Sequence, residues 1–223
     1  MVNSSPQWLT RFERLSMFNV CPNCGEYRAD KIIVPEGAYA ICPICKYHHK
    51  FLQLPLFVLA GASGSGKSTV CLALTARAKD FVVIESDILW RNEFNMPEND
   101  YRDFRETWLR LCKNISQAGK SVLLCGAGVP KQFEQCVERR YFLDIHYLAL
   151  VCDEETLISR LHSRPAWRKS TNEETIKAHI TYNRWLKNNS LNTTPPIILL
   201  DTSELTIDES VSKVEKWIRG RLT

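Results

Sequence analysis

The sequence lacks the features of a secreted or membrane protein. Its first residues, Met1-Val2-Asn3-Ser4-Ser5-Pro6, have neither the basic start nor the apolar run of a signal peptide. No apolar stretch approaches the roughly 20 residues that a membrane-spanning helix needs. We therefore expect no membrane partner and a cytoplasmic location.

The sequence also lacks a strong excess of charge. Its 29 basic and 25 acidic residues leave a net charge of +4, which is too mild to indicate by itself a protein that wraps nucleic acid. Hydrophobic residues make up 44% and charged residues 24% of the 223 residues, which excludes a largely disordered, collagenous or coiled-coil protein. A chain of this length can bury a full core and carry a small second module. The composition therefore fits a compact enzyme.

The nine cysteines are unevenly distributed along the chain. Four of them form two Cys-x-x-Cys pairs separated by 17 residues, namely Cys21, Cys24, Cys42 and Cys45. This spacing matches a four-thiolate zinc site, because each short loop places two sulfurs on one tetrahedral edge. Disulfides would need an oxidising compartment that nothing else in the sequence supports. We therefore expect a structural Zn²⁺ ion, with His48 and His49 at the surface because four thiolates already complete the shell.

The other five cysteines fall within apolar or helical stretches. They are Cys71, Cys112, Cys125, Cys136 and Cys152. In such a setting a cysteine usually behaves as a small buried hydrophobe, so we expect these five to be structural.

Residues 1–54 are expected to form an N-terminal helix and a zinc ribbon. Apolar residues recur at three-to-four spacing from Trp8 to Val20, which predicts a helix. Strand candidates at residues 31–34 and 39–41 lie between the two cysteine pairs. About 50 residues cannot bury enough surface to fold alone, so the metal supplies folding energy whatever else the ribbon does. Binding of nucleic acid by the ribbon remains an alternative. It has little support, because residues 1–54 contain six Lys or Arg against four Asp or Glu.

A phosphate-binding loop begins the second domain, which we expect at residues 55–223. The apolar run at residues 56–60 is typical of a strand buried on both faces, and an amphipathic stretch at residues 68–79 predicts a helix. Between them the sequence fits G-x-x-x-x-G-K-[ST] at every fixed position. The residues expected to bind ATP are Gly61, Ala62, Ser63, Gly64, Ser65, Gly66, Lys67, Ser68 and Thr69. Backbone N–H groups would converge on phosphate oxygens, Lys67 would neutralise the β- and γ-phosphates, and Ser68 would offer Mg²⁺ a hydroxyl.

Four further apolar runs alternate with helical patterns, at residues 81–84, 121–125, 145–151 and 196–200. Five strands with crossover helices predict an α/β fold built on a five-stranded parallel sheet. Such sheets bind ligands outside the carboxyl ends of their strands, so the residues just after each run are candidate site residues.

Two carboxylates follow the second run, at Glu85-Ser86-Asp87. Beside phosphates and Mg²⁺, Asp87 is a candidate base or orienter for an acceptor hydroxyl, and Glu85 is a candidate magnesium ligand. Alternatively, both are polar residues that merely end a strand. The third run is followed by Gly126-Ala127-Gly128, without the acidic residue of a motor ATPase, which argues against a motor.

Arginines follow the fourth run. Arg160, Arg164 and Arg168 stand four residues apart, on one helical face until Pro165 interrupts it. Guanidinium groups in this arrangement could close over a triphosphate.

Residues 55–222 resemble the small-molecule and nucleotide kinases of the P-loop superfamily, the group that includes shikimate, gluconate and nucleoside monophosphate kinases. The family's acid-x-acid element, glycine-rich turn and arginine-bearing lid match Glu85-Ser86-Asp87, Gly126-Ala127-Gly128 and residues 160–165. The resemblance implies that Asp201-Thr202-Ser203 lies beside the adenine ring. The chain departs from the family in having Glu at the first acidic position and in its zinc module, so the resemblance assigns no substrate.

The acceptor site is expected between the second strand and a predicted helix at about residues 101–119. Its candidate residues are Asp87, Trp90, Arg91, Arg102 and Arg105, and Trp90 could stack on a ring. In the alternative, Trp90 and Trp108 pack in the core and both helix arginines are solvated.

Two classes of function remain. The leading hypothesis is a kinase that transfers the γ-phosphoryl group of ATP to a small hydroxyl- or phosphate-bearing acceptor, such as a nucleoside or nucleotide. Lys67, Mg²⁺ and the lid arginines would spread the charge of the transition state. The competing hypothesis is a nucleic-acid-associated P-loop protein, either a polynucleotide end kinase or a nucleotide-dependent switch, whose ribbon grips the strand.

Overall fold

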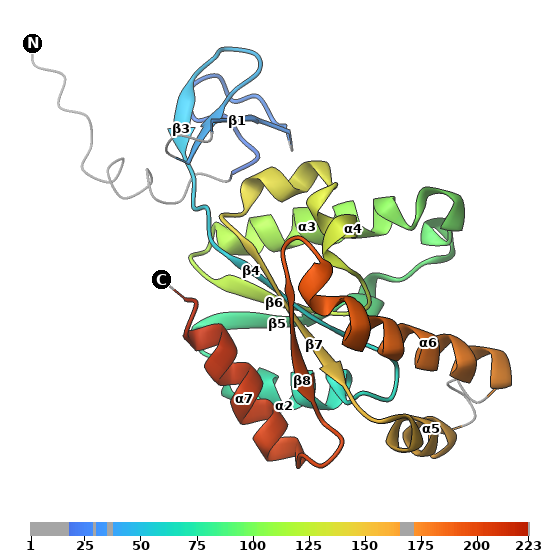
Figure 1. Cartoon of the computed structure of the whole chain (residues 1–223). Coiled ribbons are helices and arrows are strands. Elements are labelled where there is room, and N and C mark those ends of the chain that lie inside the picture. The colour runs from blue at the N-terminus through green and yellow to red at the C-terminus, as the bar shows by residue number, and fades with distance from the viewer. Residues whose placement is uncertain (1–17, 29, 35–37, 166–171, 223) are drawn as a thin grey trace, which may run out of the picture. The chain divides into compact units, whose positions relative to one another are not determined.

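The computed structural model describes residues 18–28, 30–34, 38–165 and 172–222 (Figure 1). The chain divides into two compact units, Met1–Gln53 and Leu54–Thr223. No helix within the described ranges combines the length and apolar character that a membrane span requires.

The first unit is a small antiparallel sheet with the strand order β1-β2-β3. Strands β1 (Ile32–Val34) and β2 (Tyr39–Ile41) form the predicted hairpin, and β3 (His48–Lys50) pairs with β2. The predicted N-terminal helix falls on residues 8–17, outside the described residues, and on residues 18–20, which form a turn and a bridge to Tyr27.

The expectation that both histidines lie at the surface is wrong for His49. His49 stands opposite Ala40 in the sheet and is buried, and its ring lies 5.9 Å from that of Phe18. The third strand alternates exposed, buried, exposed, so His48 faces outward and its neighbour faces inward. Burial, together with the positive charge of Lys31, lowers the pKa of His49, so its neutral form is the favoured one.

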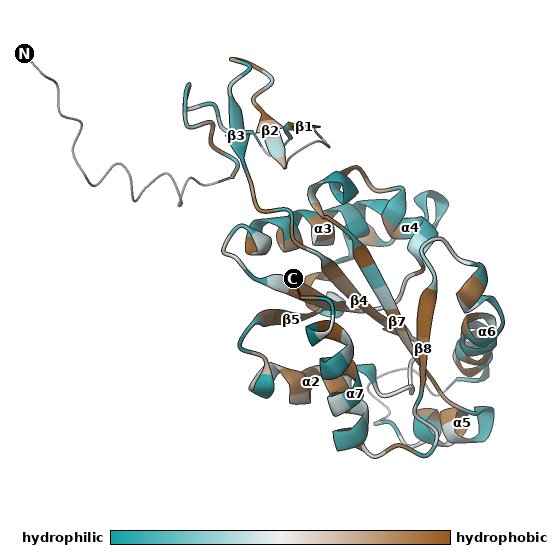
Figure 2. Ribbon diagram, turned by 60° about the vertical axis from the view of Figure 1, so that its left-hand side comes forward, coloured by the Kyte–Doolittle hydropathy of each residue, from teal (hydrophilic) through white to brown (hydrophobic). Residues whose placement is uncertain are grey.

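The second unit is built on a five-stranded parallel sheet with the order β5-β6-β4-β7-β8. All five predicted strands are present within a residue or two of their expected bounds. They are β4 (Leu56–Gly61), β5 (Phe81–Glu85), β6 (Ser121–Cys125), β7 (Ile145–Val151) and β8 (Ile197–Asp201). Strands β4 and β6 are buried along their whole length, which explains why they read as continuous apolar runs (Figure 2).

Helices cover both faces of this sheet (Figure 1). Side chains alternate along a strand, so Phe57 and Leu59 pack toward α2 (Lys67–Arg77) and α7 (Ile207–Arg219). Leu56 and Val58 pack on the opposite face, whose core includes residues of three other helices. These are α3 (Arg102–Ser116), α4 (Pro130–Glu134) and α6 (Glu173–Asn189).

The remaining elements connect strands to helices. Helix α5 (Glu154–His162) follows β7 and packs with α6 in a separate small core. Short 3-10 helices are η1 (Ser86–Leu89), η2 (Asn92–Phe94), η3 (Pro97–Asn99), η4 (Val137–Tyr141) and η6 (Ser190–Asn192). The five cysteines expected to be structural are all buried, as predicted.

Candidate active site and metal centre

The phosphate-binding loop lies between the end of β4 at Gly61 and the start of α2 at Lys67. A Cβ at Gly61 would come within 2.5 Å of the Leu150 carbonyl oxygen on the neighbouring strand, and its φ of 143° disfavours any side chain. Gly66 caps α2 with a φ of 99°, a left-handed conformation that glycine adopts readily. Both glycines are therefore required by the path of the backbone.

The Lys67 amine folds back on this loop. Its Nζ donates to the carbonyl oxygens of Gly61 at 2.6 Å and Ala62 at 2.9 Å. Burial lowers the pKa of Lys67, and the charge of Arg164 lowers it further. The Ser65 hydroxyl is buried and has no hydrogen-bond partner among the described residues. A cationic amine and an unused hydroxyl in a loop that admits no side chain at Gly61 suit a bound polyphosphate.

A cavity of about 700 Å³, which we call the first cavity, opens over the loop at the carboxyl edge of the sheet. It brings together Lys67, Glu85, Asp87, Arg160 and Arg164, which the sequence had placed on three different segments. Ser68 and Thr69 also line it. One cavity thus holds the phosphate loop, both carboxylates and two of the three predicted arginines.

The arginines differ from the predicted single helical face. Arg160 lies on α5, where its guanidinium donates to Thr202 Oγ1 at 3.3 Å and to the Thr202 carbonyl oxygen at 3.0 Å. Helix α5 ends at His162, so Arg164 lies beyond it and the expectation of a continuous helix through both residues is wrong. Pro165 explains the early end, because proline disfavours helical backbone in the residue before it. Arg168 lies outside the described residues.

Thr202 is the member of Asp201-Thr202-Ser203 that lines the first cavity. Its buried hydroxyl lies 3.1 Å from the Ser65 carbonyl oxygen and 3.2 Å from that of Val151. It therefore links the phosphate loop to the end of β7. Asp201 and Ser203 hydrogen bond to each other beside it.

A second cavity of about 530 Å³ adjoins the first. The residues common to both are Asp87, Gly126, Ala127 and Tyr182. Five further aromatic side chains line the second cavity, namely Trp90, Tyr101, Phe104, Trp108 and Phe133. Its other polar side chains include Asp100, Arg105 and Gln132. Asp87 thus faces the phosphate loop on one side and a mainly aromatic chamber on the other.

The residues expected at the acceptor site divide into two groups. Trp90 and Arg105 line the second cavity together with Asp87, and Trp108, only 1% exposed, is both a core residue and part of the wall. Arg102 and Arg91 do not line it, and that part of the expectation is wrong. Arg102 donates to the Gln135 carbonyl oxygen, and the Arg91 guanidinium lies 5.3 Å from the centre of the Phe94 ring.

Several lining residues escaped the sequence analysis. His179 and Tyr182 come from α6, and the Tyr182 hydroxyl lies 3.1 Å from the Gly128 carbonyl oxygen. No motif marks these two positions, because they reach the site only through the packing of α6 on the sheet. Cys125 also lines the first cavity, and its place as the last residue of the third predicted strand was a usable signal.

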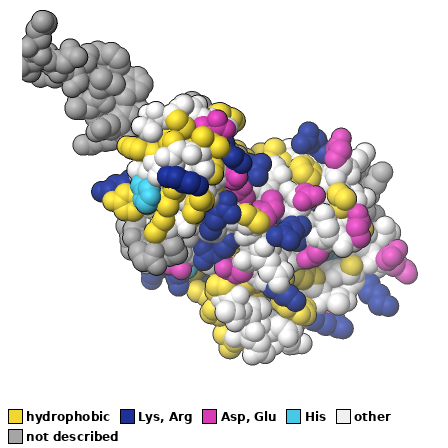
Figure 3. All heavy atoms as spheres, turned by 90° about the horizontal axis from the view of Figure 1, so that it is seen from above, with side chains coloured by type: hydrophobic (Ala, Val, Ile, Leu, Met, Phe, Trp, Pro, Cys, Tyr) yellow, Lys and Arg dark blue, Asp and Glu magenta, His cyan; other side chains and the backbone are white. Residues whose placement is uncertain are grey.

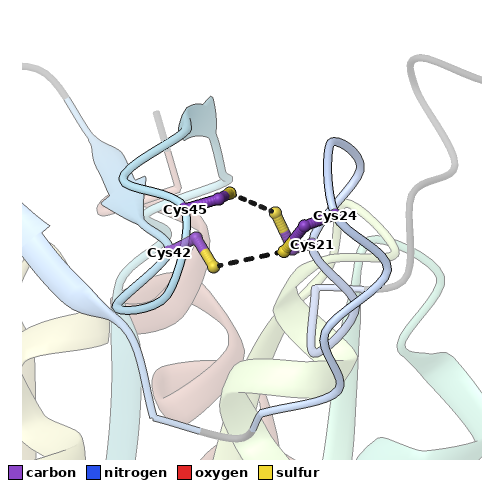
Figure 4. A group of neighbouring side chains, drawn as sticks. All are labelled: Cys21, Cys24, Cys42 and Cys45. Carbon is purple, nitrogen blue, oxygen red and sulfur yellow. Dashed lines mark hydrogen bonds between the residues drawn. The ribbon is translucent and has the colours of Figure 1, made fainter.

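Four thiols gather in the first unit (Figure 4). The Cys21 and Cys45 sulfurs lie 3.6 Å apart, those of Cys24 and Cys42 lie 3.8 Å apart, and all four lie within 4.8 Å of one another. Tetrahedral Zn²⁺ with Zn–S bonds of about 2.3 Å requires S–S separations of about 3.8 Å. A disulfide requires about 2.05 Å. The four sulfurs therefore have the spacing of a zinc shell.

The two cysteine pairs have matching backbones. The Gly25 N–H donates to the Cys21 carbonyl oxygen and the Lys46 N–H to that of Cys42, and φ is 74° at Gly25 and 60° at Lys46. Hydrogen bonds from the Asn23 side chain and the Tyr47 backbone lower the pKa of Cys45 to about 6. The Glu26 backbone favours the Cys24 thiolate, but burial and three neighbouring sulfurs raise the pKa of Cys24 to about 12. A bound dication would favour the thiolate form of all four cysteines.

Comparison with known proteins agrees with the fold. Residues 58–181 match the model of a family described as AAA domain. A crystal structure of a sugar kinase from Janibacter sp. HTCC2649 superposes with a TM-score of 0.56 at 15% identity, covering 75% of this chain and 95% of that one. A gluconokinase from Sinorhizobium meliloti 1021 gives 0.52 at 19% identity, covering 77% and 95%. No curated protein matches the sequence. At these identities the likeness is one of fold, and the fold is that of the P-loop kinases.

Proposed function

The chain belongs to the AAA domain family, and from this premise we propose that it is an ATP-dependent kinase. It transfers the γ-phosphoryl group to a small hydroxyl- or phosphate-bearing acceptor, such as a nucleoside or nucleotide. The observation that carries this proposal is the meeting of two cavities at Asp87, one over a phosphate loop and one with aromatic walls. A switch or a motor would need only the first of them.

The first cavity supplies the groups that hold ATP. Backbone N–H groups of residues 61–69 and the Lys67 amine bind phosphate oxygens, and Thr202 lies where the adenosine would approach. Ser68 and Glu85 would hold Mg²⁺, whose charge would neutralise the β- and γ-oxygens. Lys67 must leave the Gly61 and Ala62 carbonyl oxygens to reach phosphate. Its buried amine then gains an anionic partner.

Because Asp87 lines both cavities, we propose that it meets the acceptor hydroxyl where that hydroxyl approaches the γ-phosphate. Its carboxylate accepts a hydrogen bond from Ser86 Oγ at 3.3 Å, which leaves its remaining acceptor sites for a substrate hydroxyl. It orients or deprotonates that hydroxyl. Lys67, Arg160 and Arg164 spread the negative charge that develops on the transferring group.

The first test compares Asp87→Asn and Lys67→Ala with the wild-type protein. Transfer of radiolabelled γ-phosphate is measured across a panel of sugars, sugar acids, nucleosides and nucleotides. We expect Asp87→Asn to lower transfer by about a hundredfold or more and to leave ATP-analogue affinity nearly unchanged. Lys67→Ala should lower both. Asp144→Asn is the matched control, because it makes the same change on an exposed residue just before β7, at the other edge of the sheet. If Asp87→Asn transfers phosphate at the wild-type rate, Asp87 does not orient or deprotonate the acceptor. If no compound in the panel is labelled by the wild-type protein, the proposed kinase function is wrong.

A further inference from the structure

Six aromatic side chains line the second cavity. The Phe104 ring contacts the ring of Trp90 edge-on, with centroids 5.2 Å apart, and that of Trp108 edge-on at 6.3 Å. Tyr182 and Phe133 complete the walls from α6 and α4. Aromatic walls favour a ligand with a flat ring, because offset stacking and edge-to-face contacts need a planar partner.

The charges in the second cavity disfavour an anion. Its charged lining residues within the described part of the chain are Asp87, Asp100 and Arg105, which sum to −1. The Arg105 guanidinium is already engaged, because its Nη2 donates to the Asp100 backbone oxygen and to the Asp100 carboxylate at 3.2 Å. A carboxylate or phosphate in this cavity would face two aspartates and a cation already paired with one of them.

Two residues that line the second cavity carry buried donors. Arg105 Nε and Trp108 Nε1 are buried, and neither has a hydrogen-bond partner among the described residues. Buried N–H groups are rarely left unpaired, and those that are call for a functional explanation. Arg105 and Trp108 both line the second cavity, so a movement of the wall on binding would let an acceptor atom of a ligand reach these N–H groups.

The segment that leads into α3 is strained at the cavity wall. Asp100 and Tyr101 both have a φ of 55°, a left-handed conformation that is uncommon for residues other than glycine. Asp100 is held there by Arg105 and by the Gln132 amide, which donates to its carboxylate at 2.9 Å. The pairing of Asp100 with Arg105 leaves the cavity without an uncompensated cation among its described lining residues.

We propose that the phosphoryl acceptor is an uncharged molecule with a flat ring, a carbonyl-type acceptor atom on that ring and a free hydroxyl. This inference rests on the proposed function and narrows it. The ring lies among the aromatic side chains, its acceptor atom takes hydrogen bonds from Arg105 and Trp108, and the hydroxyl points to Asp87. Nucleosides have this chemistry, whereas sugar acids and nucleotides bring a negative charge that the cavity does not match.

Phosphoryl transfer to this acceptor changes bonds only in ATP, the acceptor hydroxyl and Asp87. The acceptor hydroxyl oxygen forms a bond to the γ-phosphorus, and the bond from that phosphorus to the β–γ bridging oxygen breaks. The hydroxyl proton passes to Asp87, and the products are a phosphate monoester and ADP.

The test compares nucleosides with their own 5′-monophosphates, since each pair differs at one group. The full-length protein is assayed with ATP and Mg²⁺ against the common ribo- and deoxyribonucleosides, the matching monophosphates and gluconate. We expect at least one nucleoside to be phosphorylated with a kcat/KM about a hundredfold above that of its monophosphate and of gluconate. Preference for any anionic acceptor, or no labelled nucleoside at all, would overturn the proposal.

A pair of variants tests the position of the ring. Trp90 is 44% exposed, so Trp90→Leu should fold and should raise the KM for the nucleoside about tenfold without changing the KM for ATP. Ile88→Leu is the control, because Ile88 is 70% exposed and outside both cavities. An unchanged nucleoside KM in Trp90→Leu would also contradict the proposal.

These outcomes are separable from failure of the proposed function. If an anionic acceptor is phosphorylated and the reaction depends on Lys67 and Asp87, the kinase assignment stands and only the acceptor class is wrong. If no member of either panel is phosphorylated and Lys67→Ala leaves residual ATP hydrolysis unchanged, the kinase assignment itself is wrong.

Discussion

At the scale of single residues, the first cavity concentrates positive charge around a histidine. Burial lowers the pKa of His179 from its ordinary value of 6.5, and the charges of Lys67 and Arg164 lower it further. The folded protein therefore binds fewer protons at this site than the unfolded chain does. The contribution of His179 to the free energy of unfolding is therefore fully present above pH 6.5 and is lost as the pH falls through the lowered pKa.

Phosphate binding should reverse this shift. Bound phosphates offset the charges of Lys67 and Arg164, so the pKa of His179 rises in the complex and binding takes up a proton. We expect the affinity for an unhydrolysable ATP analogue to increase as the pH falls from the pKa of His179 in the complex to its lowered pKa in the free protein, by up to about tenfold for each unit between the two. Calorimetry in buffers of different ionisation enthalpy measures the proton uptake. His179→Gln should remove this component, whereas His162→Gln, at an exposed position on α5, should retain it. Equal proton uptake by wild type and His179→Gln would contradict the assignment.

At the scale of elements, the first unit depends on its two cysteine loops. Its described strands have three residues each, and its buried apolar residues among the described ones are few, so metal binding supplies much of its folding energy.

The protein purified without added metal should carry one Zn²⁺ per chain. Cys42→Ser should lower that content and speed hydrogen exchange in residues 18–53, while exchange in residues 54–222 stays nearly unchanged because that unit has its own cores. Cys152→Ser, at a buried cysteine of the second unit, is the control. Full zinc content in Cys42→Ser would show that this sulfur is not a ligand.

The same scale shows what the sequence could predict. The five strands of the second unit are continuous apolar runs because both faces of the sheet are covered, and the phosphate loop has a fixed glycine and lysine spacing. Strand β3 was missed because His48-His49-Lys50 contains no apolar residue and is too short for a pattern. Pro165 was predicted to interrupt the arginine-bearing helix, but α5 already ends at His162. The contributions of Tyr182 and Gln132 to the second cavity could not be predicted, since they arise from helices far apart in the sequence that the sheet brings together.

At the scale of the whole molecule, the distribution of charge bears on the nucleic-acid hypothesis. Several exposed arginines are each paired with a carboxylate, as in Arg28–Asp30, Arg77–Asp208 and Arg184–Glu154. On the face drawn in Figure 3, basic and acidic side chains are interspersed. A polynucleotide is held mainly by unpaired cations that release counterions from its phosphates. The pairing of these arginines and the mixture of charges on that face give little support to a continuous basic track for a strand.

We accordingly expect no saturable binding of a single-stranded 20-nucleotide RNA or DNA below about 10 μM protein at 150 mM salt, which is the range of merely non-specific binding. Fluorescence anisotropy at 50, 100, 150 and 200 mM salt measures both the affinity and its salt dependence. Any weak binding should depend shallowly on salt, because few phosphates are neutralised. The opposite result would be submicromolar binding with a steep salt dependence that is lost in Cys42→Ser and retained in Lys67→Ala. It would show that the zinc ribbon binds the nucleic-acid strand. The acceptor would then be sought at a polynucleotide end rather than among free nucleosides.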